Sequence, residues 1–191
     1  MRTGFQRPRQ GFTLIEIVLV LALIALMIGG ALGYMVISDD ERVLSRSSVE
    51  VEVLAKRARA LAALQQRPYA LEFYEQTVSL MPLAEAMIDS RDRENALARQ
   101  EEMAAESAAP ASGFTPVRAS WTVDENVRMF VRRWASDTWL PVDIKSRHVW
   151  RFVPVGFCEP IGVWFQAEKS WLEAEFNPLT GGIRDQSQEI Y

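Results

Sequence analysis

The sequence predicts an α+β protein: a long N-terminal helix, its first half spanning a membrane, packed on a C-terminal antiparallel β-sheet domain. Three observations predict this fold. Residues 17–37 carry no charge, residues 38–67 continue with helical periodicity, and residues 68–191 hold short strand-like segments separated by turns. A chain of 191 residues has room for a globular domain with its own core besides a membrane segment.

The uncharged run is long enough to cross a bilayer. As a helix, residues 17–37 would be roughly 30 Å long, the thickness of a bilayer core. Three arginines precede it, so the positive-inside rule places the N-terminus in the cytoplasm and the bulk of the chain outside. They are Arg2, Arg7 and Arg9. A cleaved secretory signal peptide would have a shorter apolar region.

Glu16 does not fit a plain membrane anchor, because it places a carboxylate at the start of the apolar run. A lone carboxylate in hydrocarbon costs about 2 kcal/mol or more, so a partner is expected. If the chain is cut after Gly11, Phe12 becomes the first residue and carries a new ammonium group. Between staggered neighbouring helices, that ammonium can meet Glu16 of the next subunit and set the axial register of an assembly.

The segment Gly11–Met27, GFTLIEIVLVLALIALM, resembles the cleavage and methylation signature of type IV pilins and type II secretion pseudopilins. The matching positions are Gly11, Phe12, Thr13, Leu14 and Glu16. The resemblance implies that a prepilin peptidase removes leader residues 1–11 and that Phe12 is N-methylated. It also implies sister pilins or pseudopilins and an inner-membrane assembly platform as partners, and a structural rather than enzymatic role. An uncleaved signal anchor with a chance glutamate is the alternative.

A stripe of small residues recurs every four positions in the helix expected over residues 12–37. It consists of Ala25, Gly29 and Gly33. Such a stripe allows close approach of helices in lipid, so we expect it to pack against sister helices in the membrane or filament. The alternative is the general tolerance of membrane helices for glycine. The Gly29–Gly30 pair also lowers helix propensity locally.

Residues 38–67 predict an amphipathic helix. Ser38 and Glu41 form a possible capping box that would begin a new helix, whereas the resemblance implies one continuous helix. Apolar residues recur at helical spacing at Leu44, Val51, Leu54, Ala58, Leu61 and Ala62. The basic residues Lys56, Arg57 and Arg59 lie off this stripe and are expected to face solvent, with contact to another subunit as the alternative. Pro68 ends the helix.

Residues 68–191 predict a β-rich head that carries an insertion. Residues 69–81 read as a hairpin that turns near Glu75–Gln76. The insertion, residues 82–120, is poor in bulky apolar residues. Within it, residues 85–103 could form a short exposed helix and residues 104–116 read as a flexible linker, so a disordered loop is favoured over a partner-binding segment.

Further strands are expected along the C-terminal part of the head. The candidates are residues 127–134, 149–155, 161–166 and 171–176, followed by a turn at 177–182 and a last strand at Ile183–Arg184. Five of the six tryptophans lie between Trp134 and Trp171. We expect most of them in the core or in half-buried sheet positions, with a stacking platform for sugars or bases as the alternative.

The sequence provides little material for catalysis. Its lone histidine, His148, and lone cysteine, Cys158, are interpreted as structural residues, and no nucleophile elbow or phosphate loop is present. Glu168, Glu173 and Glu175 could bind a cation weakly, but a solvated sheet face is favoured. We therefore expect no catalytic site, no metal site and no cofactor. The net charge of −4 argues against nucleic-acid binding.

These features together predict a minor pseudopilin of an inner-membrane-rooted type II secretion pseudopilus. The segments RPYALEF and FNPLTGG and the tryptophan-containing strand make the head most similar to H-type minor pseudopilins. The resemblance implies a single-pass protein with a cytoplasmic N-terminus and a periplasmic head. A minor pilin of a type IV pilus or DNA-uptake system, and a pilin-anchored adhesin or binding module, are the alternatives.

Overall fold

The computed structural model describes residues 14–106 and 114–191. Contacts divide the chain into two compact units, Met1–Asp39 and Asp40–Tyr191. The first described element, α1 (Leu14–Gln65), contributes to both units. The helix is continuous from Leu14 to Gln65, so the possible capping box at Ser38 and Glu41 does not begin a new helix. Neither glycine nor proline occurs between Tyr34 and Gln65, and nothing in this stretch therefore terminates the helix.

The helix ends as Pro68 predicts. Gln66 adopts a left-handed conformation with φ 51°, which stops the helical hydrogen-bond ladder after Gln65. Two residues later Pro68 precedes β1 (Tyr69–Tyr74). The hairpin expected over residues 69–81 is confirmed, because β1 pairs with β2 (Thr77–Pro82) and Glu75 in the turn has φ 53°.

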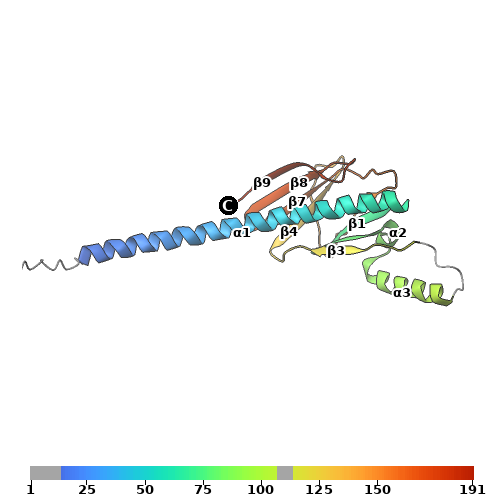
Figure 1. The fold of residues 1–191 in the computed structure, drawn as a ribbon, viewed down its shortest axis with the longest axis horizontal. Helices are drawn as coiled ribbons and strands as arrows, with labels where there is room; N and C mark the ends of the chain where they lie inside the picture. Colours follow the sequence, from blue (N-terminus) through green and yellow to red (C-terminus); the bar gives the residue numbers. More distant parts are fainter. Residues whose placement is uncertain (1–13, 107–113) are drawn as a thin grey trace, which may run out of the picture. The chain divides into compact units, whose positions relative to one another are not determined.

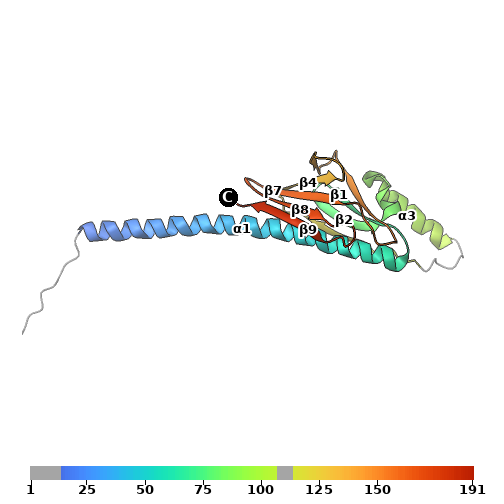
Figure 2. The same ribbon diagram turned by 90° about the horizontal axis from the view of Figure 1, so that it is seen from above.

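The second unit contains two antiparallel sheets (Figures 1 and 2). The four-stranded sheet has the order β3-β2-β1-β6, with β3 at Ala119–Thr122 and β6 at His148–Phe152. The five-stranded sheet has the order β5-β4-β7-β8-β9. Its strands are β5 (Leu140–Pro141), β4 (Val127–Arg133), β7 (Ile161–Ala167), β8 (Ser170–Phe176) and β9 (Ile183–Glu189). The predicted α+β fold with an antiparallel head is confirmed.

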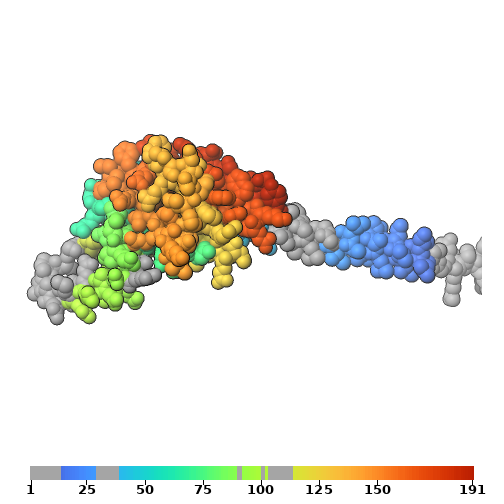
Figure 3. Space-filling view, turned by 180° about the vertical axis from the view of Figure 1, so that it is seen from behind, coloured from blue at the N-terminus to red at the C-terminus, as the bar shows by residue number. Residues whose placement is uncertain are grey.

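The core of this unit joins the helix to both sheets. The buried apolar side chains of α1 are Leu44, Val51, Leu54, Ala55, Ala58 and Ala62. Five of them belong to the predicted stripe, whose sixth member, Leu61, is half-buried. They belong to one apolar cluster with Tyr69, Leu71 and Phe73 of β1 and with the inward residues of the five-stranded sheet. On β4 the predicted alternation holds, since Val127, Met129 and Val131 are buried. Figure 3 shows the surface that the later strands form on this unit, in yellow through red.

The insertion is more structured than expected. Residues 83–106 contain α2 (Leu83–Ala86) and α3 (Ser90–Glu106), and β3 lies inside the range 82–120. The expectation of a disordered loop is therefore wrong for these residues, whereas the short helix expected over residues 85–103 is present as α3, shifted a few residues along the chain. The expectation of disorder was drawn from the scarcity of large apolar side chains, whereas the segment is held by ion pairs and by a small apolar cluster of Ala70, Met81 and Ala86. Most of the expected linker, residues 107–113, lies outside the described residues.

The last strand is longer than the sequence suggests. We expected only Ile183–Arg184, but β9 continues to Glu189 and pairs with β8 from one end to the other, with one irregularity opposite Glu175 and Phe176. Its residues after Ile183 are exposed and polar, so no apolar alternation marks them as a strand. Backbone pairing with the buried strand β8 decides their conformation instead.

Candidate assembly and anchoring sites

The described start of α1 is an apolar helix exposed on all sides. Every side chain from Leu14 to Met27 is exposed, and most are leucine, isoleucine or valine. A helix that is apolar all round is typical of a segment buried by other molecules. Within the described residues, however, no helix reaches the length and apolarity needed to cross a membrane.

Glu16 is the only charged residue in this part of the helix. Its side chain is exposed in the first turn of α1. Ala25 is exposed too, about two and a half turns of helix further on. Gly29 and Gly33 lie within α1, but the structure does not describe what packs against them. Gly11 and Phe12 precede the described residues, so the cleavage junction, the methylation site and the packing stripe stay predictions.

Two polar contacts fasten the later part of α1 to other segments of the head, and an ion pair within the helix supports one of them. Glu52 Oε1 accepts the backbone N–H of Ile183 at 3.0 Å, and Lys56 lies 2.9 Å from the same carboxylate oxygen. The hydrogen bond with Lys56 is the main cause that lowers the pKa of Glu52, partial burial opposes it, and the bond from Ile183 adds to the lowering. Arg59 Nε donates to the carbonyl of Gly156 at 2.9 Å. Lys56 and Arg59, which were expected to face solvent, therefore both take part in contacts within the head.

The closing turn of the head rests directly on α1. Gly181 has φ +67°, and a Cβ on it would lie 3.3 Å from the carbonyl oxygen of Ala55. The turn is held by the Asn177 N–H donating to the Gly182 carbonyl and by the Gly181 N–H donating to the Asn177 carbonyl. Glycine is therefore required at Gly181 both for the left-handed backbone and for the close approach to the helix.

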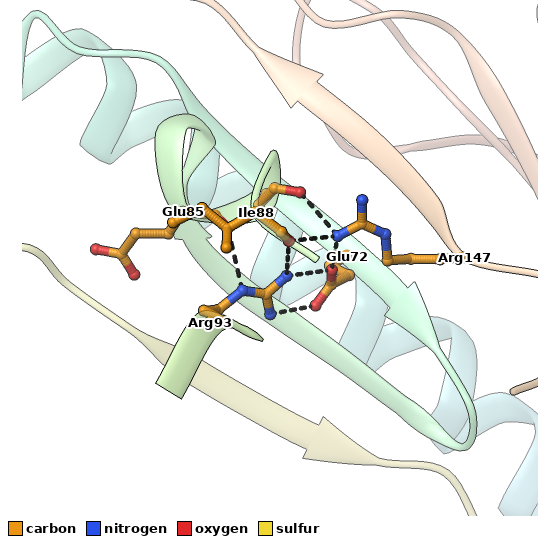
Figure 4. Close-up of polar contacts among 6 residues, drawn as sticks. Glu72, Glu85, Ile88, Arg93 and Arg147 are labelled. Carbon is orange, nitrogen blue, oxygen red and sulfur yellow. Dashed lines mark hydrogen bonds and ion pairs between the residues drawn. The ribbon is translucent and has the colours of Figure 1, made fainter. Parts of the chain in front are cut away.

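A buried ion-pair cluster, which the sequence did not predict, anchors the insertion (Figure 4). Glu72 on β1 is only 3% exposed. Arg93 of α3 donates to both of its carboxylate oxygens, at 2.6 and 2.5 Å, and Arg147 donates to Oε1 at 3.0 Å. The hydrogen bond with Glu72 is the first cause that raises the pKa of Arg93. One buried carboxylate thus serves two guanidinium groups.

The remaining donors of the two arginines bind backbone carbonyls at and after the end of α2. Arg93 donates to the carbonyls of Glu85 and Ile88, and Arg147 donates to those of Ala86 and Ile88. These carbonyls lie where a helix leaves its acceptors unsatisfied. A signal was present in the sequence, because Glu72 interrupts the otherwise apolar strand YALEFY. Such a strand is covered on both faces, so its one carboxylate needs a buried partner.

The acidic residues considered for a cation do not form a cation site. Arg132 lies between Glu173 and Glu175, at 3.0 and 2.5 Å, and Arg184 pairs with Glu175 as well. Glu168 is in the β7–β8 turn with φ 47°. Among the described residues no cluster of metal-binding side chains occurs. A guanidinium group occupies the position that a cation would take.

The tryptophans are distributed as expected, with one exception. Trp150 is buried in the core, where its indole N–H donates to the Glu159 carbonyl at 2.6 Å. Trp164 contacts Phe130, Trp139 and Trp171 with ring centroids 5.1, 5.7 and 6.5 Å apart. These rings pack mainly on each other, which argues against an open stacking platform. The exception is Trp134, which is 71% exposed.

His148 and Cys158 both have structural contacts. His148 is buried, and its Nε2 lies 3.0 Å from the Pro141 carbonyl. Cys158 is buried, and its Sγ lies 3.3 Å from the Pro178 carbonyl. Burial raises the pKa of the Cys158 thiol to about 11, which disfavours the reactive thiolate.

Comparison with known proteins finds a family motif in the N-terminal segment of the chain. Residues 6–32 match the prokaryotic N-terminal methylation motif, a span that includes Gly11, Phe12 and Glu16. Among solved structures, the chain is similar to the minor pseudopilin EpsH from the type 2 secretion system of Vibrio cholerae. That similarity has 6% identity and a TM-score of 0.41, over 78% of this chain and 96% of that chain. No curated protein matches the sequence.

Proposed function

We propose that this chain, which carries the N-terminal methylation motif of pilins and pseudopilins, is a minor pseudopilin that builds a type II secretion pseudopilus. The motif match over residues 6–32 is the observation that carries the proposal. In this role the chain is the substrate of a prepilin peptidase and a structural subunit. Its N-terminal helix anchors it in the inner membrane before assembly, with the N-terminus cytoplasmic and the head periplasmic.

Cleavage prepares the subunit for assembly by changing its charges. Removal of residues 1–11 takes away Arg2, Arg7 and Arg9 and leaves an ammonium group on Phe12. Glu16 follows one helical turn later, too far along the same helix for an ideal pair. The ammonium of a staggered neighbour can approach the carboxylate more closely. This pairing neutralises two charges in an apolar environment and favours one axial register over others.

The exposed apolar start of α1 supports an assembly role. Side chains such as Leu14, Ile15 and Leu26 are covered by nothing within the described chain. In a filament the helices of sister subunits would cover them, and in the membrane the lipid would. Ala25, Gly29 and Gly33 would allow those helices to approach closely.

The contacts between α1 and the head support transmission of movement through the subunit. Glu52 and Arg59 hold Ile183 and the Gly156 loop against the helix, and the closing turn passes close to the carbonyl of Ala55. A displacement applied to the helix would therefore carry this part of the head with it. A secretion filament needs such rigidity if its growth is to move a substrate.

The experiment expresses the full chain with and without a prepilin peptidase and sequences the mature N-terminus. We expect an N-methylated Phe12 only when the peptidase is present. Replacing Gly11 with valine should block processing, whereas Gly4→Val, a matched change within the leader, should leave it intact. An uncut leader in the presence of the peptidase contradicts the proposal.

A second measurement addresses the secretion role. Glu16→Gln should be cleaved like the native chain but recovered with sister pseudopilins in much smaller amounts. Glu41→Gln, an exposed glutamate further along α1, is the matched control and should assemble normally. Loss of the gene should lower the export of secreted proteins if the chain belongs to a secretion system. If the chain belongs to a pilus or DNA-uptake system, the loss should instead lower the number of surface pili or the uptake of DNA.

A further inference from the structure

An exposed tryptophan stands at the end of β4. Trp134 is 71% exposed, although tryptophan is on average a highly buried residue in folded proteins. The turn after the strand fixes the backbone beside it, since Ala135 has φ 61° and the Ser136 N–H donates to the Arg133 carbonyl at 3.2 Å. A side chain on such a structured turn loses less freedom when a ligand binds to it. The indole of Trp134 is therefore both accessible and well positioned.

Trp134 borders a hollow of about 270 Å³ at one end of the five-stranded sheet. The hollow lies where β4 and β8 end and where β7 and β9 begin. Its apolar lining includes Pro160, Ile161 and Phe176. Pockets that enclose drug-sized ligands have volumes of roughly 300–1,000 Å³, so this hollow suits a single small ring.

The charges around the hollow balance one another. Three arginines and three carboxylates lie in its lining or pair with it: Arg132, Arg133, Arg184, Glu173, Glu175 and Asp137. Arg132 pairs with Glu173 at 3.0 Å and with Glu175 at 2.5 Å, and Arg184 pairs with Glu175 as well. Because the opposite charges are equal in number, the hollow favours neither an anion nor a cation.

A neutral ligand with several hydroxyl groups fits this lining. A hydroxyl group both donates and accepts hydrogen bonds, and the guanidinium and carboxylate groups supply partners of both kinds. One face of a sugar ring consists mainly of C–H groups, which can lie against the electron-rich face of an indole. A nucleic acid would bring phosphate charges, and the hollow has no net positive charge to neutralise them.

We propose that the hollow beside Trp134 binds one ring of a neutral glycan. Trp134 stacks on the C–H face of the ring, and Arg133 and Asp137 hydrogen-bond its hydroxyl groups. Both of these side chains are exposed, and neither forms an ion pair with the part of the chain that the structure describes. The proposal goes beyond the proposed function, because neither leader cleavage nor filament assembly requires a sugar site.

Fluorine NMR of the full-length chain tests the proposal. The chain is labelled with 5-fluorotryptophan and kept in an amine-oxide detergent, which has no sugar headgroup. The resonance of Trp134 is the one that disappears in Trp134→Phe. The probes are neutral trisaccharides built from glucose, galactose, mannose or N-acetylglucosamine. We expect at least one of them to shift the Trp134 resonance in a saturable way, and glycerol, which has hydroxyl groups but no ring, to give no saturable shift.

Substitutions test the assigned roles, with affinity measured by saturation transfer from the protein to the sugar protons. Trp134→Ala should weaken binding at least tenfold, because the stacking surface is lost. Asp137→Ala should weaken it about tenfold, because a charged hydrogen-bond acceptor is lost. The matched controls are Leu179→Ala and Glu125→Ala, an exposed apolar residue and an exposed carboxylate on other turns, and both should bind like the native chain.

Four results would overturn the proposal. They are the absence of a saturable shift with every neutral trisaccharide, native affinity in Trp134→Ala, tighter binding of an acidic trisaccharide or an oligonucleotide, and a Trp134 resonance that responds to sister subunits but to no sugar. The last result would make this surface a protein interface instead. Leader cleavage is measured separately, so a failed sugar site leaves the proposed function standing, and an uncut leader leaves the sugar site untouched.

Discussion

Arg93 and Glu72 form a two-point ion pair across 21 positions of sequence, with both nitrogen–oxygen distances at or below 2.6 Å. Glu72 comes from the four-stranded sheet and Arg93 from the first turn of α3. A helix whose sequence is mostly polar and charged is therefore fixed to the head by an ion pair. Arg147, in the loop before β6, completes the cluster from a third segment.

The first prediction concerns this cluster. Glu72→Gln leaves Arg93 and Arg147 without a buried counter-charge, so we expect a loss of about 3 kcal/mol in the free energy of unfolding. The α2–α3 segment should also become sensitive to protease before the rest of the head. Denaturant unfolding of the purified protein and timed proteolysis measure the two effects. Glu94→Gln, on the exposed face of α3, should have little effect. Equal stability of the Glu72 and Glu94 variants would show that the cluster does not hold the insertion.

The second prediction concerns pH. The pKa of Glu52 is lowered in the folded state, chiefly by Lys56, so its ionised form favours folding. This contribution is complete above the ordinary glutamate pKa of about 4.5 and is lost as pH falls through the lower folded value. In Glu52→Gln the decline of stability in that acidic range should be shallower. Thermal unfolding from pH 7 to pH 3 measures it, with Glu50→Gln as control. A decline as steep as in the native chain would contradict the assignment.

The third prediction concerns the closing turn. Gly181→Ala combines a left-handed backbone with a Cβ 3.3 Å from the Ala55 carbonyl, so it should destabilise the protein by about 2 kcal/mol. Gly182→Ala meets the side chains of Glu52 and Lys56, which can move, and should cost less. The difference between the two melting temperatures is the measurement. The reverse order would mean that the turn does not rest on α1 as described.

The fourth prediction concerns Cys158. Its thiol has a pKa raised to about 11 by burial, so a maleimide at pH 7 should label the native protein very slowly. Labelling should become fast in denaturant. Asn126→Cys, an exposed position, supplies the control for reagent activity and should react at once. Rapid labelling of Cys158 in the native protein would show that the loop around it opens.

The N-terminal signature was recognisable in the sequence because it depends on local order alone. A glycine, a phenylalanine and a glutamate stand at set distances from a basic leader and an apolar run, and no folding is needed to read them. The same holds for the stripe of Leu44, Val51, Leu54, Ala58 and Ala62, where helical periodicity predicts the buried face. The hairpin after Pro68 follows from its alternating and turn residues.

The tertiary structure decided which distant charges meet. The sequence shows Glu72 as an odd carboxylate and Glu173 and Glu175 as a pair on one strand face, but not that arginines from other elements neutralise them. Arg93, Arg132 and Arg147 reach their partners only through strand pairing and helix docking. Long-range contacts of this kind leave no local pattern, because each residue type suits solvent equally well. For the same reason, the sequence alone predicts the N-terminal motif and the buried stripe of the helix, and only the fold determines which arginines hold the insertion.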